Sequence, residues 1–156
     1  MTVKPIPDGY HSVTPYLSIK GAAEAIEFYK LAFSATELFR LVAPSGVIGH
    51  AEIKIGDSHI MLADSCEEIG FRSPKTLGGS SVGLLVYIED VDALFAQAVA
   101  AGAKVVKPVQ DQFYGDRSGT LEDPFGHLWF LATHREDLTL EEINKRAEAL
   151  FKHGDA

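Results

Sequence analysis

A cluster of polar side chains surrounds a short turn in the first half of the sequence. Gly56 and Asp57 separate two strand-like segments, 48–55 and 58–63, and this spacing predicts a β-hairpin with a two-residue turn. Opposed residues in a hairpin share a face, so alternate residues of both segments lie on one surface. That surface is predicted to carry His50, Glu52, Lys54, His59 and Met61, while Ala51, Ile53 and Ile55 face a helix.

Imidazole and carboxylate groups on one surface can move protons to and from a bound molecule. Glu52 together with His50 or His59 is therefore a candidate acid/base pair. The alternative is structural: the same three residues can form a polar, partly solvated strand face at the mouth of a pocket.

A second candidate lies in the segment 112–119, which interleaves aromatic residues with glycines and a single arginine. Phe113, Tyr114 and Arg117 suit a loop that covers a planar or anionic ligand, because a guanidinium can bind a carboxylate or a phosphate through two parallel hydrogen bonds. The alternative is a turn shaped only by Asp116 and Arg117.

The composition excludes several classes of function. A net charge of -8 repels phosphate backbones and anionic lipid surfaces, so we expect neither a nucleic-acid nor a membrane partner. No apolar run approaches the length of a membrane span, the N-terminus lacks a signal-peptide pattern, and Cys66 is the sole cysteine. We expect a cytoplasmic protein without a disulfide, and the sequence contains no dinucleotide, phosphate-loop or nucleophile-elbow motif.

The predicted strands and helices occur in the same order twice along the sequence. Strand-like and helical segments follow one another as βαβββ, and displacing the first copy by 69 residues places Ile19 on Ile88 and Leu62 on Leu131 without a gap. The first copy comprises 13–19, 22–33, 37–42, 48–55 and 58–63, and the second comprises 81–88, 91–101, 104–109, and a hairpin of 120–122 with 127–132.

We therefore expect one α+β domain over residues 1–156. Unit one spans about 13–65, unit two spans about 81–134, and a C-terminal helix spans about 139–152. Thr139 and Glu142 have the spacing of a capping box at the start of that helix.

Two helix motifs and one turn motif carry a resemblance to a known family. With Ala25-Ile26-Glu27-Phe28-Tyr29, Asp90-Val91-Asp92-Ala93-Leu94 and Asp123-Pro124-Phe125-Gly126-His127, the chain resembles the glyoxalase/bleomycin-resistance/dioxygenase superfamily, also called vicinal oxygen chelate proteins. The residues of segments 13–17, 56–62 and 113–117 are similar to those of its PhnB-like subgroup. The resemblance implies U-shaped mixed sheets with helices on the outer face, a concave pocket and a homodimer.

The resemblance also implies four positions for the metal ligands of the family's enzymes. They fall on Thr14, Met61, Gly83 and Phe130, none of which is a strong ligand for a divalent metal. We therefore expect no metal at the usual site and no cofactor. Tyr16 and Tyr87 share the strand phase of Thr14 and Gly83 and are predicted to face the pocket, whereas His127 and Trp129 are predicted to face the helices.

Two functions are consistent with these residues. The first is a metal-independent protein that binds a small organic molecule in an aromatic-lined pocket. Its predicted ligand-binding residues are Thr14, Tyr16, Met61, Tyr87, Phe113, Tyr114, Arg117 and Phe130. The alternative is a lyase, isomerase or dioxygenase-type enzyme of the same superfamily that uses Glu52 with His50 or His59, either at a displaced metal or as acid/base groups.

Overall fold

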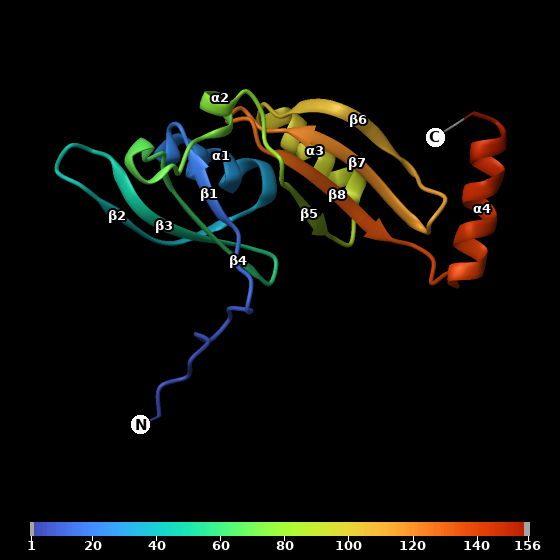
Figure 1. The fold of residues 1–156 in the computed structure, drawn as a ribbon, viewed down its shortest axis with the longest axis horizontal. Coiled ribbons are helices and arrows are strands. Elements are labelled where there is room, and N and C mark those ends of the chain that lie inside the picture. The colour runs from blue at the N-terminus through green and yellow to red at the C-terminus, as the bar shows by residue number, and fades with distance from the viewer. Residues whose placement is uncertain (1, 155–156) are drawn as a thin grey trace.

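The protein forms two four-stranded mixed sheets in a computed structural model that describes residues 2–154 (Figure 1). Unit one contains β1 (Tyr16–Ile19), α1 (Ala22–Phe33), β2 (Thr36–Val42), β3 (Ile48–Ile55) and β4 (Ser58–Asp64). Unit two contains β5 (Gly83–Tyr87), α3 (Val91–Ala101), β6 (Lys104–Asp111), β7 (Asp116–Glu122) and β8 (Leu128–His134). The strand orders β1-β4-β3-β2 and β5-β8-β7-β6 are equivalent, so the predicted α+β fold with a duplicated βαβββ order is confirmed.

Each sheet is mixed because its first and last strands run parallel. The β1–β4 and β5–β8 pairs are parallel, and every other neighbouring pair is antiparallel. A helix must connect β1 to β2 across the sheet, and α1 does so in unit one as α3 does in unit two. The two helices pack against each other, and the Gln97 side-chain amide donates to the backbone carbonyls of Leu31 and Ala32 at 2.9 and 3.2 Å.

The predicted gap-free repeat is wrong at β7. Met61 pairs with Glu52 in unit one, whereas Phe130, 69 residues later, pairs with Thr120, which lies 68 residues after Glu52. The cause is the closing loop, which has two residues between Ile55 and Ser58 but five between Glu122 and Leu128. The extra loop residues change the register by one position, and a shift of one position turns every side chain to the other face.

Two further regions differ from the expected elements: the start of the first strand and the segment 112–119. The first strand begins at Tyr16, after Pro15, and not at residue 13. β7 begins at Asp116, so Arg117 lies in a strand, and the predicted loop over 112–119 reduces to residues 112–115. The connection between units contains the short helices η1 (Glu67–Ile69) and α2 (Pro74–Leu77).

The core lies between the helices and the inner faces of both sheets. Its centre is an aromatic group from both units, in which the rings of Tyr29 and Trp129 lie 5.3 Å apart and those of Phe33 and Trp129 lie 4.4 Å apart. Trp129 is completely buried against these α1 rings, which confirms the prediction that it faces the helices. His127 is also buried, with its Nε2 3.3 Å from the Ser18 backbone carbonyl of β1. The aromatic group joins unit one to unit two.

The last helix, α4 (Leu140–Lys152), lies at the far end of unit two (Figure 1). The Thr139 hydroxyl accepts a hydrogen bond from the Glu142 backbone N–H at 3.1 Å, as expected for a capping box. The Glu142 carboxylate does not complete the box; it accepts from Arg146 at 3.1 Å. Arg146 also pairs with Glu136 and donates to the Phe113 carbonyl, and these contacts hold α4 against unit two.

Candidate functional site

The first hairpin positions a polar face on unit one. The register pairs Glu52 with Met61 and Lys54 with His59, as predicted from the turn length. Ala51, Ile53 and Ile55 are buried on the opposite side, against the core. The alternation of the strands therefore fixes which side chains face away from the helix.

Tyr16, His50 and Glu52 form a continuous chain of hydrogen bonds on this face. The Tyr16 hydroxyl lies 2.6 Å from His50 Nδ1, and His50 Nε2 lies 2.8 Å from Glu52 Oε2. Glu52 is only 9% exposed, whereas Tyr16 is 45% exposed. The structure thus brings together two of the three candidate acid/base residues and adds Tyr16, which the sequence places on another strand.

His59, the third candidate, makes different contacts. Its ring packs edge to face against Tyr10 at 4.2 Å between centroids. Within residues 2–154, the His59 Nδ1 and the Tyr10 hydroxyl are buried without a hydrogen-bond partner. His59 therefore belongs to a separate part of the surface, next to the N-terminal segment.

Unit two has a different polar chain on the equivalent face. The Tyr87 hydroxyl donates to Asp116 at 2.8 Å, and the other Asp116 oxygen lies 2.7 Å from His134 Nδ1. The hydrogen bond to the Asp116 carboxylate raises the pKa of Tyr87. Hydrogen bonds to Asp116 and Asp137 raise the pKa of His134. His134 was not among the sequence candidates; its phase with Phe130 and Ala132 on β8 was the signal that could have identified it.

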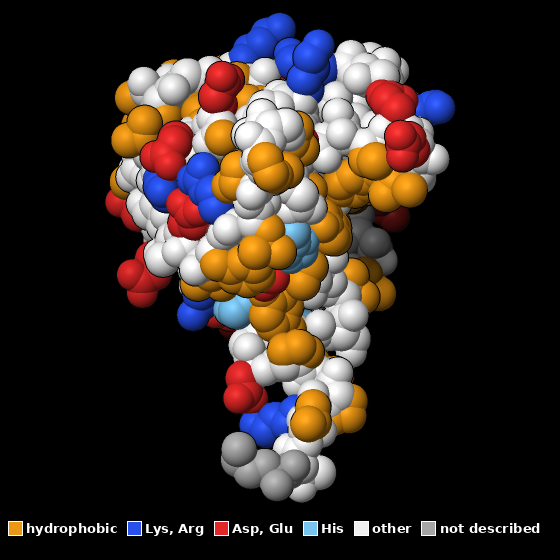
Figure 2. Space-filling model, turned by 90° about the vertical axis from the view of Figure 1, so that its left-hand side faces the viewer, with side chains coloured by type: hydrophobic (Ala, Val, Ile, Leu, Met, Phe, Trp, Pro, Cys, Tyr) orange, Lys and Arg blue, Asp and Glu red, His pale blue; other side chains and the backbone are white. Residues whose placement is uncertain are grey.

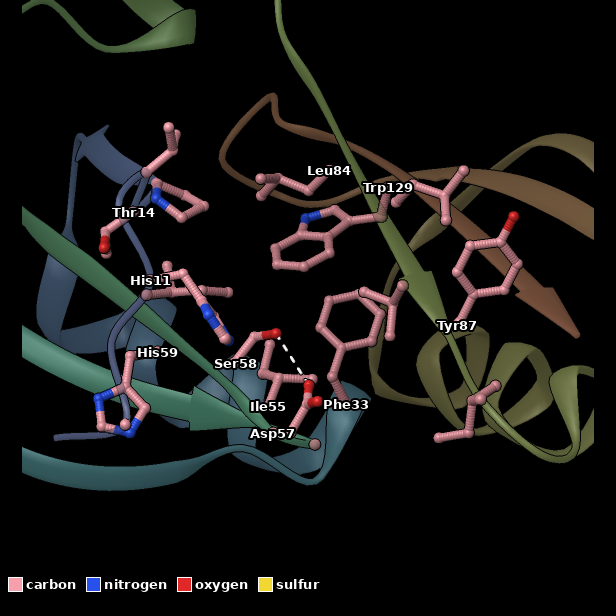
Figure 3. Close-up of a pocket in the computed structure, with 18 of the residues that line it drawn as sticks. His11, Thr14, Phe33, Ile55, Asp57, Ser58, His59, Leu84, Tyr87 and Trp129 are labelled. Carbon is pink, nitrogen blue, oxygen red and sulfur yellow. Dashed lines mark hydrogen bonds between the residues drawn. The ribbon is translucent and has the colours of Figure 1, made fainter.

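A cavity of about 780 Å³ lies between the two units (Figure 3). Phe33 and Trp129 lie between its two sides, with His11 and Thr14 on the unit-one side and Tyr87 on the other. Its remaining walls come from both units and the N-terminal segment: Gly9, Tyr10, Val13, Pro15, Ser34, Ile55, Gly56, Asp57, Ser58, His59, Ile60, Leu84, Leu85, Val86 and Ile88.

A smaller cavity of about 390 Å³ lies beside β1. Tyr16, Phe71 and Arg72 contribute to its walls, together with Pro74, Leu77 and other residues of the connection between units. The Tyr16 ring packs edge to face against Phe71 at 5.2 Å. Of the eight predicted ligand-binding residues, Thr14 and Tyr87 thus line the larger cavity and Tyr16 lines the smaller one.

The remaining predicted ligand-binding residues lie outside both cavities. Arg117 donates to both carboxylate oxygens of Asp92, at 2.8 and 2.9 Å, and to Asp111 at 3.2 Å. These hydrogen bonds raise the pKa of Arg117 and occupy the guanidinium within the protein. Phe113 and Tyr114 pack against each other at 5.2 Å in the turn before β7.

The residues at the four positions that the resemblance implies for metal ligands do not fit a divalent metal. Thr14 offers a neutral hydroxyl and Met61 a thioether, while Gly83 has no side chain and Phe130 has no donor atom. The Phe130 ring fills the space over Gly83, because a Cβ built there would lie 2.4 Å from the ring. Among residues 2–154, no group of three or more His, Cys, Asp and Glu side chains is arranged to hold a metal ion.

The surface of unit one next to the polar face of Tyr16, His50 and Glu52 is rich in apolar side chains. Figure 2 shows hydrophobic side chains gathered around histidine on this end of the molecule. The exposed apolar residues of β2 and the following turn are Leu38, Phe39, Leu41, Val42 and Val47. No helix within residues 2–154 has the length and apolar character needed to cross a bilayer.

Known proteins share both the sequence pattern and the fold. Residues 11–131 match the family model described as Glyoxalase/Bleomycin resistance protein/Dioxygenase superfamily. An uncharacterised protein of Mycobacterium tuberculosis strain H37Rv is 40% identical over 147 residues, which cover 92% of this chain and 85% of the relative. An uncharacterised Arabidopsis thaliana protein is 30% identical over 125 residues, covering 76% of this chain and 75% of the relative.

Solved structures give the same result for the fold. TioX from Micromonospora sp. ML1 superposes with a TM-score of 0.64 at 27% identity, covering 83% of this chain and all of TioX. A PhnB protein from Bacillus cereus has a TM-score of 0.61 at 21% identity, covering 79% of this chain and 99% of that protein. FosX, a fosfomycin resistance protein from Listeria monocytogenes solved with Mn(II) and sulfate, has a TM-score of 0.62 at 21% identity, with coverage of 88% and 97%. The last two comparisons show the fold alone.

Proposed function

Since the chain belongs to the glyoxalase/bleomycin resistance protein/dioxygenase superfamily, we propose that it binds a small organic molecule in the cavity between its two units. The observation that carries this proposal is the size and lining of that cavity. Its volume of about 780 Å³ lies in the range of small-molecule sites, and its walls are largely apolar with a few polar groups. No step of this proposal uses a metal, because the side chains at the usual positions do not fit one.

The ligand we propose has a planar apolar body and at least one polar substituent. Phe33 and Trp129 contribute to the cavity from within the core, and the exposed apolar walls are Val13, Leu85 and Tyr87. The buried His59 Nδ1 and Tyr10 hydroxyl lack protein partners within residues 2–154, and an unpaired buried polar atom costs about 1–3 kcal/mol. A polar substituent of the ligand that reaches either atom recovers that hydrogen bond.

The proposal extends to subgroup and assembly. The segments 13–17, 56–62 and 113–117 support membership of the PhnB-like subgroup. The exposed apolar side chains of β2 and those of α4, including Leu140 and Phe151, supply surface for a homodimer in the cytoplasm.

The test uses the single tryptophan of the chain, which lines the cavity. The probe is 8-anilinonaphthalene-1-sulfonate, an aromatic anion whose bound form accepts energy from a nearby indole. Val86→Phe fills part of the cavity, and we expect it to weaken probe binding at least about tenfold. The matched control is Val106→Phe, at an exposed position of β6 outside the cavity.

Two readouts together decide the question. Titration of the probe gives the affinity. Quenching of Trp129 emission shows whether the probe lies near this lining residue of the larger cavity. Circular dichroism of both variants verifies that they fold. Equal affinity in the two folded variants, or binding without quenching of Trp129, would contradict the proposal.

A further inference from the structure

One proton arrangement lets every member of the chain of Tyr16, His50 and Glu52 make its hydrogen bond. A carboxylate in its ionised form only accepts hydrogen bonds, and a neutral His50 that donates to it has its proton on Nε2, 2.8 Å from Glu52. His50 Nδ1 then carries a lone pair, and the Tyr16 hydroxyl, 2.6 Å away, donates to it. The hydrogen bonds therefore run from a hydroxyl to an imidazole base and from the imidazole to an orienting carboxylate. This is the arrangement that activates a hydroxyl as a nucleophile.

The exposure of the three residues matches these roles. Glu52 is nearly buried and His50 is partly buried, so the orienting groups are shielded from water. Tyr16 is the most exposed of the three and lines the smaller cavity of about 390 Å³. Its ring is held between His50 at 5.3 Å and Phe71 at 5.2 Å. Tyr16 is thus the member of the chain with the largest exposed fraction, and its hydroxyl points across β4 to His50.

Unit two contains a tyrosine, Tyr87, whose hydroxyl donates to a carboxylate and not to an imidazole. Tyr87 donates directly to the Asp116 carboxylate, and the neighbouring negative charge opposes loss of the phenol proton and raises its pKa. Tyr16 donates to an imidazole nitrogen instead, which can accept the proton and share the resulting charge with Glu52. The two tyrosines therefore differ in the group that accepts their hydroxyl proton, although Tyr87 is the more exposed, at 61%.

We propose that Tyr16 is a nucleophile activated by His50, and that this face of unit one accepts acyl groups from small aryl esters or thioesters. The Tyr16 oxygen forms a bond to the acyl carbon while its proton passes to His50 Nδ1. The bond from the acyl carbon to the leaving oxygen or sulfur breaks, and the leaving group departs as an anion with the bonding electron pair. Water then adds to the acyl carbon and the bond to the Tyr16 oxygen breaks, which releases the carboxylic acid and restores the Tyr16 hydroxyl. His50 loses the proton that it gained to the solvent, where it neutralises the leaving-group anion, and the base is restored.

The composition of the polar chain favours activated esters as substrates. The chain of hydrogen bonds contains one base and no separate acid, so a leaving group that is stable as an anion is favoured. Tyr16 is the catalytic residue, His50 is its base, and Glu52 is a positioning residue.

The experiment uses p-nitrophenyl acetate with the full-length protein. Release of p-nitrophenolate is followed by absorbance, and peptide mass spectrometry locates the acetyl group. We expect acetylation at Tyr16 in preference to Tyr87 and to Tyr114, which are also exposed. Tyr16→Phe should abolish the early burst, and His50→Gln should slow acetylation at least about tenfold, since a positioned base contributes 10²–10⁴-fold.

A matched variant and a spectroscopic measurement separate chemistry from structure. His134→Gln removes the partly exposed imidazole of unit two, and Tyr16 acetylation should stay within about twofold of the wild-type rate. Glu52→Gln should slow acetylation by a smaller factor and move the His50 proton from Nε2 towards Nδ1, which ¹⁵N NMR of the ring nitrogens detects.

The outcome for the intact protein is decisive even if a variant fails to fold. Acetyl groups distributed among the tyrosines according to exposure, or a Tyr16 rate that does not change in folded His50→Gln, would overturn the proposal. Tyr16, His50 and Glu52 lie outside the lining of the larger cavity. Tyr16→Phe should therefore bind 8-anilinonaphthalene-1-sulfonate as the wild type does, so failure here is distinguishable from failure of the proposed binding function.

Discussion

The last hairpins of the two units occupy equivalent places but have different closing loops and different roles. In unit one, Gly56 and Asp57 form a short exposed turn on the wall of the larger cavity. In unit two, five residues close the hairpin, and Asp123 at the start of that loop is buried. The longer loop also shifts the register of β7 by one residue, so Ser118 and Thr120 occupy the positions equivalent to His50 and Glu52.

The two units thus have the same strand order but different side chains on equivalent faces. A change in loop length alters which residues of one strand face outwards, while the strand order and helix positions stay the same. Unit one has an imidazole and a carboxylate on its outward face, and unit two has hydroxyl residues there. The polar chain of unit two uses the ends of its strands instead, at Tyr87, Asp116 and His134.

The largest effect is expected from the aspartate in the closing loop of unit two. One Asp123 oxygen accepts from the backbone N–H groups of Phe125 and His127 at 2.8 and 3.0 Å. The other accepts from the Tyr29 hydroxyl at 2.6 Å and from the Trp129 indole at 2.9 Å. Asp123→Ala leaves four buried donors unpaired and should lower the free energy of unfolding by about 3–5 kcal/mol.

Urea denaturation measures this change, and Asp57→Ala is the matched control. Asp57 is exposed and accepts only from the neighbouring Ser58 hydroxyl at 3.1 Å. Its replacement should alter the free energy of unfolding by less than about 0.5 kcal/mol. Similar losses at the two positions would show that the hairpins do not differ in the way described.

A second, smaller effect is expected where the helix of unit two crosses β7. A Cβ added at Gly119 would lie 2.6 Å from the Phe95 ring and 3.0 Å from Val109. The equivalent residue of unit one is Ala51, which pairs with Leu62 as Gly119 pairs with Leu131. Gly119→Ala should therefore cost about 1–3 kcal/mol through overpacking.

A double variant and a control complete this test by urea denaturation. Adding Phe95→Leu to Gly119→Ala should recover part of the loss, because the two residues are in contact. Gly49→Ala lies in an exposed part of β3 with no atom nearer than the Leu41 carbonyl oxygen at 4.0 Å, and should change stability by less than about 0.5 kcal/mol. Strictly additive losses in the double variant would argue against close packing of Phe95 on Gly119.

The smallest expected effects are opposite in their pH dependence. In unit one, hydrogen bonds from Arg40 and Lys30 lower the pKa of Glu37 from 4.5 to about 2, against the opposing effect of burial. Because the folded-state pKa is depressed, the stabilisation is present above pH 4.5 and is lost as the pH falls towards 2. The stability difference between the wild type and Glu37→Gln should therefore shrink on acidification.

In unit two the dependence is reversed. The pKa of His134 is raised from 6.5 by Asp116 and Asp137, so its stabilisation is present below pH 6.5 and is lost as the pH rises through the folded-state pKa. The difference between the wild type and His134→Gln should shrink on alkalinisation, as measured by thermal denaturation at a series of pH values. A wild-type-minus-variant difference that changes in the same direction for both residues would refute this contrast.

The sequence by itself determined the features that depend on local spacing. A two-residue turn fixed the pairing of Glu52 with Met61, and strand alternation fixed the burial of Ala51, Ile53 and Ile55. The duplicated order of elements followed from the same kind of periodicity. Local spacing is sufficient in these cases because neighbours along the chain restrict one another directly.

Only the tertiary structure decided which distant side chains meet. Tyr16 bonds to His50 across the intervening strand β4, and Asp92 at the start of α3 binds the Arg117 side chain. The one-residue shift of β7 was likewise invisible in the sequence, since it depends on how the 123–127 loop folds around the Asp123 carboxylate. Such contacts are decided by strand adjacency and side-chain rotamers, neither of which is fixed by residue spacing.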